Sequence, residues 1–378
     1  MNKLDIAHEF PLDQDIIYLN HAAVAPWPVR TTQAITNFAK ENTSRGATNY
    51  PDWVITEKQT KEQLQKLINA GSTEEIALLK NTSEALSLIA YGLDWQAGDN
   101  IVTSDQEFPS NRIVWESLKN KDVDLLEVNL SQGSSPEDAI ITRANDNTRL
   151  ITISSVQYAT GLRIDLAKLG RYCHENNILF CVDAIQSLGA VQFDVEDIHA
   201  DFVMADAHKW MLAPEGIALF YCRANKRNLL QLNQFGWHMI EDYLNYNTRE
   251  WEIAHSSRRF ECGSPNMLGI HALNASLSLL LDVGMEQVEK ALLDNTLYLA
   301  NAIKALNDYT LISSTEPEQL AGIVTFGHNI ADPAALFQYL KSNHVICAER
   351  GGGIRFSPHF YTPQATMDRA IKLLADYA

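Results

Sequence analysis

The chain has 378 residues and a formal net charge of −17, because 47 Asp and Glu outnumber 30 Lys and Arg. Hydrophobic residues make up 46 % and charged residues 20 %, which is the balance of a globular protein and excludes a largely disordered chain. The acidic excess argues against a nucleic-acid or anionic-membrane binder, since such proteins need basic side chains to neutralise phosphates. At roughly 100–200 residues per domain, the length predicts two or three domains.

After a short N-terminal arm, helical patterns alternate with short apolar runs that predict strands. Helices are predicted over 57–69 and 166–176, and strands over 100–103, 124–128, 149–154, 178–182, 202–205 and 217–221. Buried strands separated by helices predict a mostly parallel sheet. Later patterns predict helices over 268–281 and 287–306, a strand over 322–326 and a hairpin over 345–357. We expect an α/β fold with a large domain over 16–260 and a small α+β domain over 261–378, on which the arm 1–15 packs.

The cysteines and the apolar runs indicate the cellular compartment of the protein. Five cysteines are scattered without a CxxC pair, which is typical of reduced thiols and predicts neither a disulfide framework nor a metal site. The N-terminal segment lacks the apolar stretch of a signal peptide, and no run approaches the roughly 20 apolar residues of a membrane span. We expect a cytoplasmic protein.

Polar residues follow several predicted strands, at the sheet edge where open α/β proteins bind ligands. Thr82 and Ser83 can cap the helix that follows them, either as ordinary caps or as part of an anion seat. Asp183 ends an apolar strand, where a carboxylate either faces a cation or caps the next helix. Lys209 follows the next strand and is either a Schiff-base lysine or a solvated one. Arg355 suits either a substrate carboxylate or an ion pair with a neighbouring acid.

Taken in order, these residues resemble the fold type I enzymes of pyridoxal 5′-phosphate (PLP), and more narrowly the class V aminotransferase family. The resemblance covers nearly the whole chain and is carried by the stretches YLNHAAVAPWP, VDAIQSLGA, ADAHKWMLAPEG and IRFSPHFYT. That family includes cysteine desulfurases, selenocysteine lyases, isopenicillin N epimerase and, more distantly, kynureninase. The resemblance implies that the large domain binds PLP and that the substrate is an amino acid.

The resemblance also implies roles for individual residues. Lys209 matches the Schiff-base lysine, which also moves the substrate Cα proton, and Asp183 matches the partner of the pyridinium nitrogen, which makes the ring an electron sink. Further cofactor contacts are implied for Thr82, Ser83 and His208 at the phosphate, for Gln186 at the phenolic oxygen, and for Ser264 at the phosphate of a neighbouring subunit. Substrate contacts are implied for Arg355, at the α-carboxylate, and for Asn20, His21 and Trp237. The Ser264 match implies a homodimer with shared active sites.

Three positions depart from the usual desulfurase pattern. Phe108, in the stretch EFPSN, stands where desulfurases place a histidine over the cofactor ring. A phenylalanine can stack there but cannot relay protons, as in the kynureninase and epimerase branches. Tyr158 stands where many desulfurases carry an asparagine that contacts the cofactor oxygen. Asp206 replaces a serine that often binds phosphate, and because a carboxylate would repel a dianion, we expect its side chain to point away.

The reaction itself stays open at this point. A cysteine desulfurase needs a thiolate on a mobile loop ahead of Arg355, whereas the only thiol near it, Cys347, lies in an apolar stretch typical of a buried strand. A transaminase, an epimerase and a desulfurase-like or selenocysteine lyase-like C–S lyase share the same first steps at Cα. A non-catalytic scaffold of the same fold is the alternative from another class, and the combination of Lys209, Asp183 and Arg355 argues against it.

Overall fold

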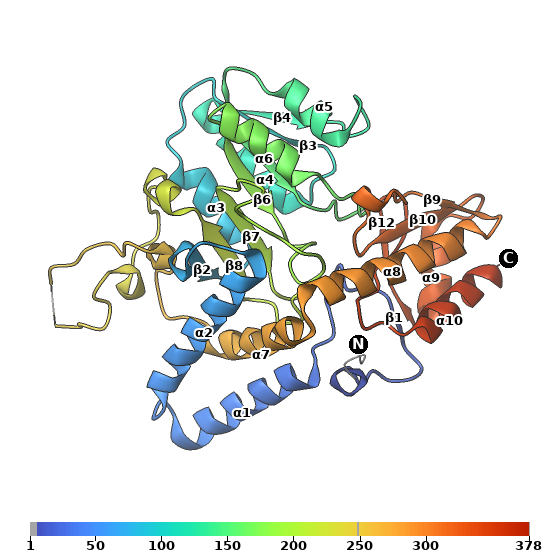
Figure 1. Cartoon of the computed structure of the whole chain (residues 1–378), viewed down its shortest axis with the longest axis horizontal. Coiled ribbons are helices and arrows are strands. Elements are labelled where there is room, and N and C mark those ends of the chain that lie inside the picture. The colour runs from blue at the N-terminus through green and yellow to red at the C-terminus, as the bar shows by residue number, and fades with distance from the viewer. Residues whose placement is uncertain (1–5, 248, 378) are drawn as a thin grey trace.

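A seven-stranded sheet forms the centre of the large domain in the computed structural model, which describes residues 6–247 and 249–377 (Figure 1). The strands from β3 to β7 pair in parallel, whereas β8 runs antiparallel to both of its neighbours, β7 and β2. In sheet order the strands are β2 (Ile76–Leu79), β8 (Ala218–Cys222), β7 (Phe202–Asp206), β6 (Leu179–Asp183), β5 (Thr148–Ser154), β3 (Asn100–Ser104) and β4 (Asp124–Val128). The predicted α/β fold with a mostly parallel sheet is confirmed.

Helices cover both faces of this sheet, which explains why its strands are apolar throughout rather than alternating. Along β6, Phe180 and Val182 pack into one core cluster, and Leu179 and Cys181 pack into another. The helices of the large domain are α1 (Val29–Arg45), α2 (Tyr50–Ile68), α3 (Thr82–Gly92), α4 (Pro109–Glu116), α5 (Pro136–Arg143), α6 (Leu166–Glu175) and α7 (Met267–Val283). Buried residues of α2, α6 and α7 belong to the first cluster and those of α3 and α4 to the second.

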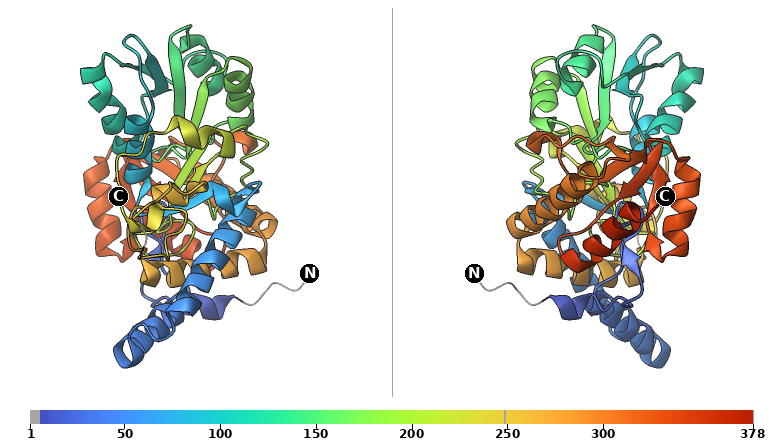
Figure 2. Two further views of the ribbon diagram at one scale, coloured as in Figure 1. Left: turned by 90° about the vertical axis from the view of Figure 1, so that its left-hand side faces the viewer. Right: turned by 90° about the vertical axis from the view of Figure 1, so that its right-hand side faces the viewer.

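A smaller domain packs beside the sheet and is reached through α8 (Met285–Lys304), which runs between the two parts (Figures 1 and 2). Its antiparallel sheet has the order β12 (Ala348–Arg350), β13 (Gly353–Phe356), β10 (Val324–His328) and β9 (Tyr309–Leu311). The helices α9 (Pro333–Ser342) and α10 (Gln364–Ala375) complete it, and β1 (Ile17–Tyr18) pairs in parallel with β11 (Val345–Ile346). The chain near its start therefore joins the small domain.

The boundaries 16–260 and 261–378 stay a prediction, and α7 packs on the large-domain side. It packs chiefly against α1 and α2, and its buried residues Leu273, Leu277 and Leu280 lie in the core cluster of the large sheet. The core cluster of the small domain begins, after the arm, at Leu299.

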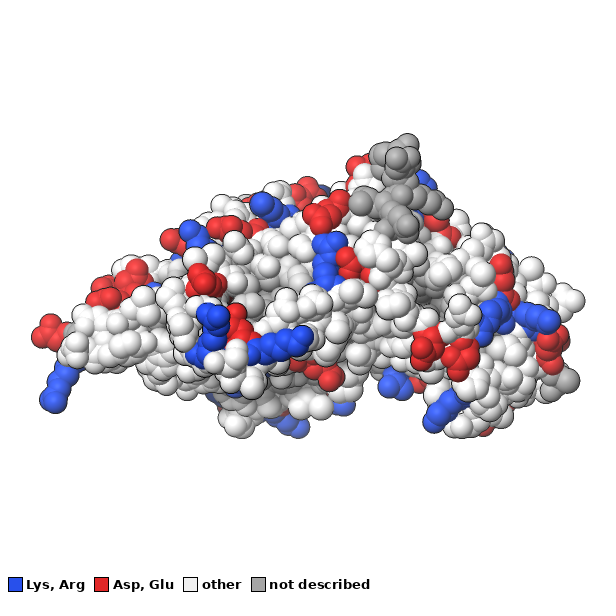
Figure 3. Space-filling model, turned by 90° about the horizontal axis from the view of Figure 1, so that it is seen from below, with Lys and Arg blue, Asp and Glu red and all other residues white. Residues whose placement is uncertain are grey.

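The surface charges and the helices bear on whether the protein binds an anionic partner or crosses a membrane. On the face seen in Figure 3, basic and acidic side chains are interspersed, without a continuous basic patch. Among the described residues, no single helix is long and apolar enough to cross a membrane, and α7 and α8 meet that test only together, as a pair bent by 84°.

Gly189 joins two loops that follow neighbouring strands, and we predict that Gly189→Ala destabilises the fold. Its φ of +90° strains any side chain, and an added Cβ would lie 2.2 Å from the carbonyl oxygen of Trp210, beside Lys209. Gly98 has a similar φ of +93° with nothing within 4 Å of the added Cβ, so Gly98→Ala is a matched control for the strain alone. In urea unfolding we expect losses of about 1 kcal/mol for Gly98→Ala and about 3 kcal/mol or more for Gly189→Ala. Equal losses would contradict the steric role of this contact.

Candidate active site

Lys209 and Asp183 meet because they follow adjacent parallel strands. Asp183 is the last residue of β6, and Lys209 lies in the loop directly after β7. Burial raises the pKa of Asp183, and burial lowers the pKa of Lys209 to about 8, against the opposing effect of the Asp183 charge. An amine with such a pKa is partly the free base at neutral pH, which is the form that attacks a carbonyl.

Two N–H groups hold the Asp183 carboxylate in place. The amide of Asn111, on α4, donates to Oδ2 at 2.6 Å, and the backbone N–H of Ile185 donates to Oδ1 at 2.9 Å. Both bonds favour the ionised carboxylate, and each oxygen keeps a lone pair for a further donor. The sequence interpretation missed Asn111, although it lies at the end of the stretch EFPSN that contains Phe108.

A second buried carboxylate, Glu107, is connected to Asp183 through Ser154 and Asn111. It accepts hydrogen bonds from the Gln157 amide at 2.8 Å, from the backbone N–H of Ser154 at 3.0 Å and from the Ser154 hydroxyl at 2.5 Å. Ser154 in turn lies 3.4 Å from the Asn111 amide. Burial raises the pKa of Glu107, and the Asp183 charge adds to that effect. Glu107 was also missed, since nothing in a single sequence distinguishes it from a surface glutamate.

The N-terminus of α3 is where a seat for an anion is predicted, and the structure corrects the predicted helix cap there. The helix cap is Asn81, whose Oδ1 accepts from the Glu84 N–H at 2.8 Å, so the prediction that Thr82 or Ser83 caps this helix is wrong. Asn81 has the extended backbone and the short acceptor that an N-cap requires. The Thr82 hydroxyl instead accepts from the backbone N–H of Asp206 at 3.2 Å, and the Ser83 hydroxyl donates to that of Ser110 at 2.9 Å.

That Asp206 points away from a bound phosphate stays a prediction, and the structure places its side chain beside His208. Its side chain is 14 % exposed, and its Oδ2 lies 3.8 Å from Nδ1 of His208. Burial raises the pKa of Asp206 to about 7 and lowers the pKa of His208 to about 4. Neither Oδ1 of Asp206 nor Nδ1 of His208 has a hydrogen-bond partner in the part of the chain that the structure describes. A carboxyl group and a neutral imidazole therefore lie together beside Thr82.

Aromatic side chains border the space around the Lys209 amine. Its Nζ lies 5.8 Å from the ring centroid of Phe108, and that ring meets Tyr158 edge-on at 5.2 Å. Phe108 is 43 % exposed and offers a face to a flat ligand. Gln186 donates to the Ala22 carbonyl at 3.0 Å and accepts from the Trp210 indole at 2.7 Å, so it fixes the loop that carries Lys209 and has one amide hydrogen left.

Arg355 brings the small domain to this group. It lies on β13, is 3 % exposed, and donates from Nη1 to the Tyr158 carbonyl at 2.7 Å. Burial lowers the pKa of Arg355 to about 10, and the charge of Arg355 lowers the pKa of Lys209. Its Nε has no hydrogen-bond partner within the described residues. A buried guanidinium with an unused donor is suited to an anion.

The other predicted substrate residues are placed differently. Nδ1 of His21 bonds the Ser357 carbonyl at 2.8 Å and Nε2 bonds the Tyr361 hydroxyl at 2.8 Å, so neither ring nitrogen is left for a substrate. Asn20, next to it, has a buried Oδ1 without a partner among the described residues. Trp237 packs against Tyr243 and Tyr246 in the segment after β8, and Ser264 lies exposed before α7.

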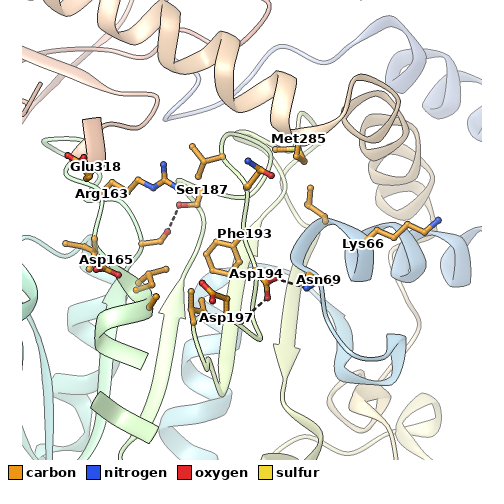
Figure 4. Close-up of a pocket in the computed structure, with 18 residues that line it drawn as sticks. Lys66, Asn69, Arg163, Asp165, Ser187, Phe193, Asp194, Asp197, Met285 and Glu318 are labelled. Carbon is orange, nitrogen blue, oxygen red and sulfur yellow. Dashed lines mark hydrogen bonds between the residues drawn. The ribbon is translucent and has the colours of Figure 1, made fainter. Parts of the chain in front are cut away.

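Two further features of the structure do not involve Lys209, Asp183 or Arg355. The pocket in Figure 4 is lined by charges of both signs, including Lys66, Asp194 and Asp197, but not by Lys209, Asp183 or Arg355. Elsewhere, Glu57, His238 and Glu261 approach one another closely enough to hold a metal. Lys61 already balances that cluster, since its Nζ lies 3.1 Å from Glu57 and 2.8 Å from Glu261.

Comparison with known proteins identifies the family. The family described as aminotransferase class-V matches residues 17–364. The chain belongs to this family of PLP-dependent enzymes. A "Probable cysteine desulfurase" of Methanothermobacter thermautotrophicus is 30 % identical over 96 % of the chain and 94 % of that protein. An "Uncharacterized aminotransferase" of Bacillus subtilis is 27 % identical over 87 % of the chain and 85 % of that protein.

Solved structures show the same fold at lower identity. An apo cysteine desulfurase from Thermococcus onnurineus NA1 has a TM-score of 0.87 and 22 % identity, over 98 % of this chain and 97 % of that one. The cystine C–S lyase C-DES, in complex with its product cysteine persulfide, has a TM-score of 0.89 and 21 % identity, over 97 % and 98 % of the two chains. These likenesses confirm the fold predicted from the family resemblance.

The residues present fit the cofactor of the family. PLP carries a phosphate, a ring nitrogen and an aldehyde, and this region holds a helix N-terminus, a buried carboxylate and a buried lysine of lowered pKa. The unpartnered buried atoms of Asp206, His208 and Arg355 add polar capacity that the described chain itself does not use.

We predict that Lys209 of the cofactor-free protein titrates near pH 8 and that Asp183→Asn lowers this value further. The Asp183 charge raises the pKa of Lys209, so its removal favours the neutral amine. The measurement is acetylation of Lys209 against pH, followed by peptide mass spectrometry. Asp201→Asn is the control, because the Asp201 carboxylate is also buried but its charge does not act on Lys209. A wild-type midpoint near the ordinary lysine value of about 10.4 would contradict the assignment.

Proposed function

We propose that this chain is a PLP-dependent C–S lyase that cleaves a sulfur-containing amino acid without using a thiol of its own. The observation that carries the proposal is the contrast between two groups. Lys209 lies buried with Asp183 and Arg355 acting on its charge, whereas Cys347, the thiol nearest to Arg355 in the sequence, is closed into the small-domain core. The names of the relatives, cysteine desulfurases and a cystine C–S lyase, support sulfur chemistry.

Cys347 is poorly suited to be the sulfur acceptor of a desulfurase. It is 7 % exposed and lies between β11 and β12, and burial raises its pKa to about 12. The thiolate, not the thiol, is the nucleophile, so a high pKa keeps the group inert at neutral pH. The turn from β12 to β13, just ahead of Arg355, contains only Gly351 and Gly352 and carries no other thiol.

Each residue of the site has a role in this proposal. Bound PLP supplies electron withdrawal at the substrate Cα when its ring nitrogen is protonated. The carboxylate of Asp183 holds that proton, and the amine of Lys209 takes the proton from Cα. Arg355 binds the substrate α-carboxylate and so orients the Cα–H bond toward Lys209. The remaining groups hold the cofactor: Thr82, Ser83 and His208 at the phosphate, Phe108 on the ring face, and Gln186 and Tyr158 at the phenolic oxygen.

The overall reaction is an elimination followed by hydrolysis. The Cα–H bond and the Cβ–S bond break, and the sulfur leaves with the electron pair of the Cβ–S bond and takes up a proton. The remaining three-carbon fragment takes up water and releases ammonia and pyruvate. No oxidant or reductant is consumed. Because the sulfur leaves with its electron pair and a proton, the chain needs no thiol of its own to accept it.

We also propose that the protein is a cytoplasmic homodimer with shared active sites. Ser264 lies exposed, and the segment after β8 presents large exposed side chains, namely Phe235 at 63 %, Tyr246 at 73 % and Trp251 at 57 %. Exposed aromatic side chains that recur along one segment favour an interaction surface there. In such a dimer, Trp237 and Ser264 would serve the partner's site. All five cysteines are free, as a reducing compartment requires.

The cofactor attachment can be tested by colour. We expect the purified protein, after incubation with PLP, to absorb in the near-visible region, and Lys209→Ala to lose that absorbance, because the lysine amine forms the covalent link. Lys168→Ala is the control and should leave the spectrum unchanged, since Lys168 lies on α6 and is paired with Asp138 of α5. A colourless wild-type protein would refute the enzyme assignment.

The reaction can be tested by its products. With L-cysteine we expect pyruvate, ammonia and sulfide, and with L-cystine we expect pyruvate, ammonia and cysteine persulfide. We expect Cys347→Ala to change the rate by less than about threefold. Cys262→Ala, at a thiol outside the group, is the matched control. Alanine formed with sulfur release that collapses in Cys347→Ala would instead establish a desulfurase. Transfer of the amino group to a keto acid, or inversion at Cα, would establish the other two alternatives.

A further inference from the structure

Asp206 lies inside the seat that we assign to the cofactor phosphate. Its backbone N–H donates to the Thr82 hydroxyl at 3.2 Å, and its Oδ2 lies 3.8 Å from Nδ1 of His208. The side chain is 14 % exposed, so it has little access to water. Its Oδ1 is buried and has no hydrogen-bond partner in the described ranges. A carboxyl group therefore stands, with unused bonding capacity, between two groups that are proposed to bind a dianion.

An ionised carboxylate at this place would oppose phosphate binding. The surrounding charges act in both directions: Asp183 on β6 and Glu215 ahead of β8 repel a negative charge on Asp206, whereas Lys209 attracts it. His208 adds no positive charge, because burial keeps its imidazole neutral at physiological pH. Burial is the largest effect and brings the pKa of Asp206 to about 7 before any anion arrives. A phosphate dianion nearby would favour the protonated carboxyl group further.

We propose that Asp206 binds the cofactor phosphate as a neutral carboxylic acid, donating one hydrogen bond, so that cofactor binding retains a proton on the protein. This inference rests on the proposed PLP site and adds to it a residue that sets the pH range of cofactor retention. When neutral, the carboxyl group is both a donor and an acceptor, like the serine hydroxyl that it replaces. When ionised, it can only accept and so repels the phosphate.

The consequence is a specific pH dependence of cofactor affinity. Because the bound state holds a proton that the free protein releases above about pH 7, affinity falls as the pH rises. The loss is about tenfold for each pH unit between the free and the bound pKa of Asp206. Lys209 acts in the opposite direction, since its neutral amine is favoured at higher pH. That second effect applies equally to pyridoxal, which has the same aldehyde but no phosphate.

The test compares dissociation constants of PLP and pyridoxal, measured by equilibrium dialysis from pH 6 to pH 9. For the wild-type protein we expect the preference for PLP over pyridoxal to fall at least about tenfold between pH 7 and pH 9. For Asp206→Asn, which keeps the size of the side chain and a donor but cannot ionise, we expect a preference nearly independent of pH above 7. Asp206→Ser serves as a second variant if the asparagine protein unfolds, and its preference should be equally flat.

The outcomes separate this inference from the proposed function. A PLP preference that falls equally with pH in the wild-type protein and in both variants overturns the role of Asp206 and leaves the PLP site standing. A preference that stays flat in the wild-type protein also overturns that role. Failure of the wild-type protein to bind either PLP or pyridoxal at any pH overturns the proposed function as well.

Discussion

The burial of Lys209 beside Asp183 is the constraint on which the rest of the site depends. A lysine and an aspartate at the carboxyl ends of adjacent parallel strands are brought together by the sheet itself. Burial disfavours the charged form of each, so the pKa of the lysine is lowered and that of the acid is raised. This arrangement fits a cofactor ring whose protonated nitrogen donates a hydrogen bond to the Asp183 carboxylate.

Hydrogen bonds from surrounding residues hold in place the Asp183 carboxylate and the loop that carries Lys209. Asn111 binds the Asp183 carboxylate, and behind it Glu107 accepts several hydrogen bonds around Ser154. On the lysine side, Gln186 binds the Trp210 indole, and the Trp210 carbonyl lies 3.2 Å from Nε2 of the small-domain residue His359. The two domains therefore meet at the loop that carries Lys209, which is also where Arg355 enters.

The proposed elimination of sulfur does not depend on Cys347, so the burial of this thiol is no obstacle to it. A desulfurase moves sulfur to a thiolate of its own, which has to be exposed and ionised. Cys347 is neither, and Phe108 offers a ring face but no proton relay. The proposed elimination needs the electron withdrawal of the cofactor, a base at Cα and an anchored carboxylate, and it needs no thiolate of the protein.

The sequence alone determined the alternation of strands and helices, because a sheet covered on both faces requires continuous apolar runs that a single chain displays openly. The family motifs further indicated Lys209, Asp183 and Arg355. Only the tertiary structure decided the rest, because it depends on contacts between distant segments. Those contacts brought Asn111 to the Asp183 carboxylate, linked Glu107 to it through Ser154, and engaged both ring nitrogens of His21. Burial and neighbouring charge set the protonation of such groups, and neither can be read from residue order.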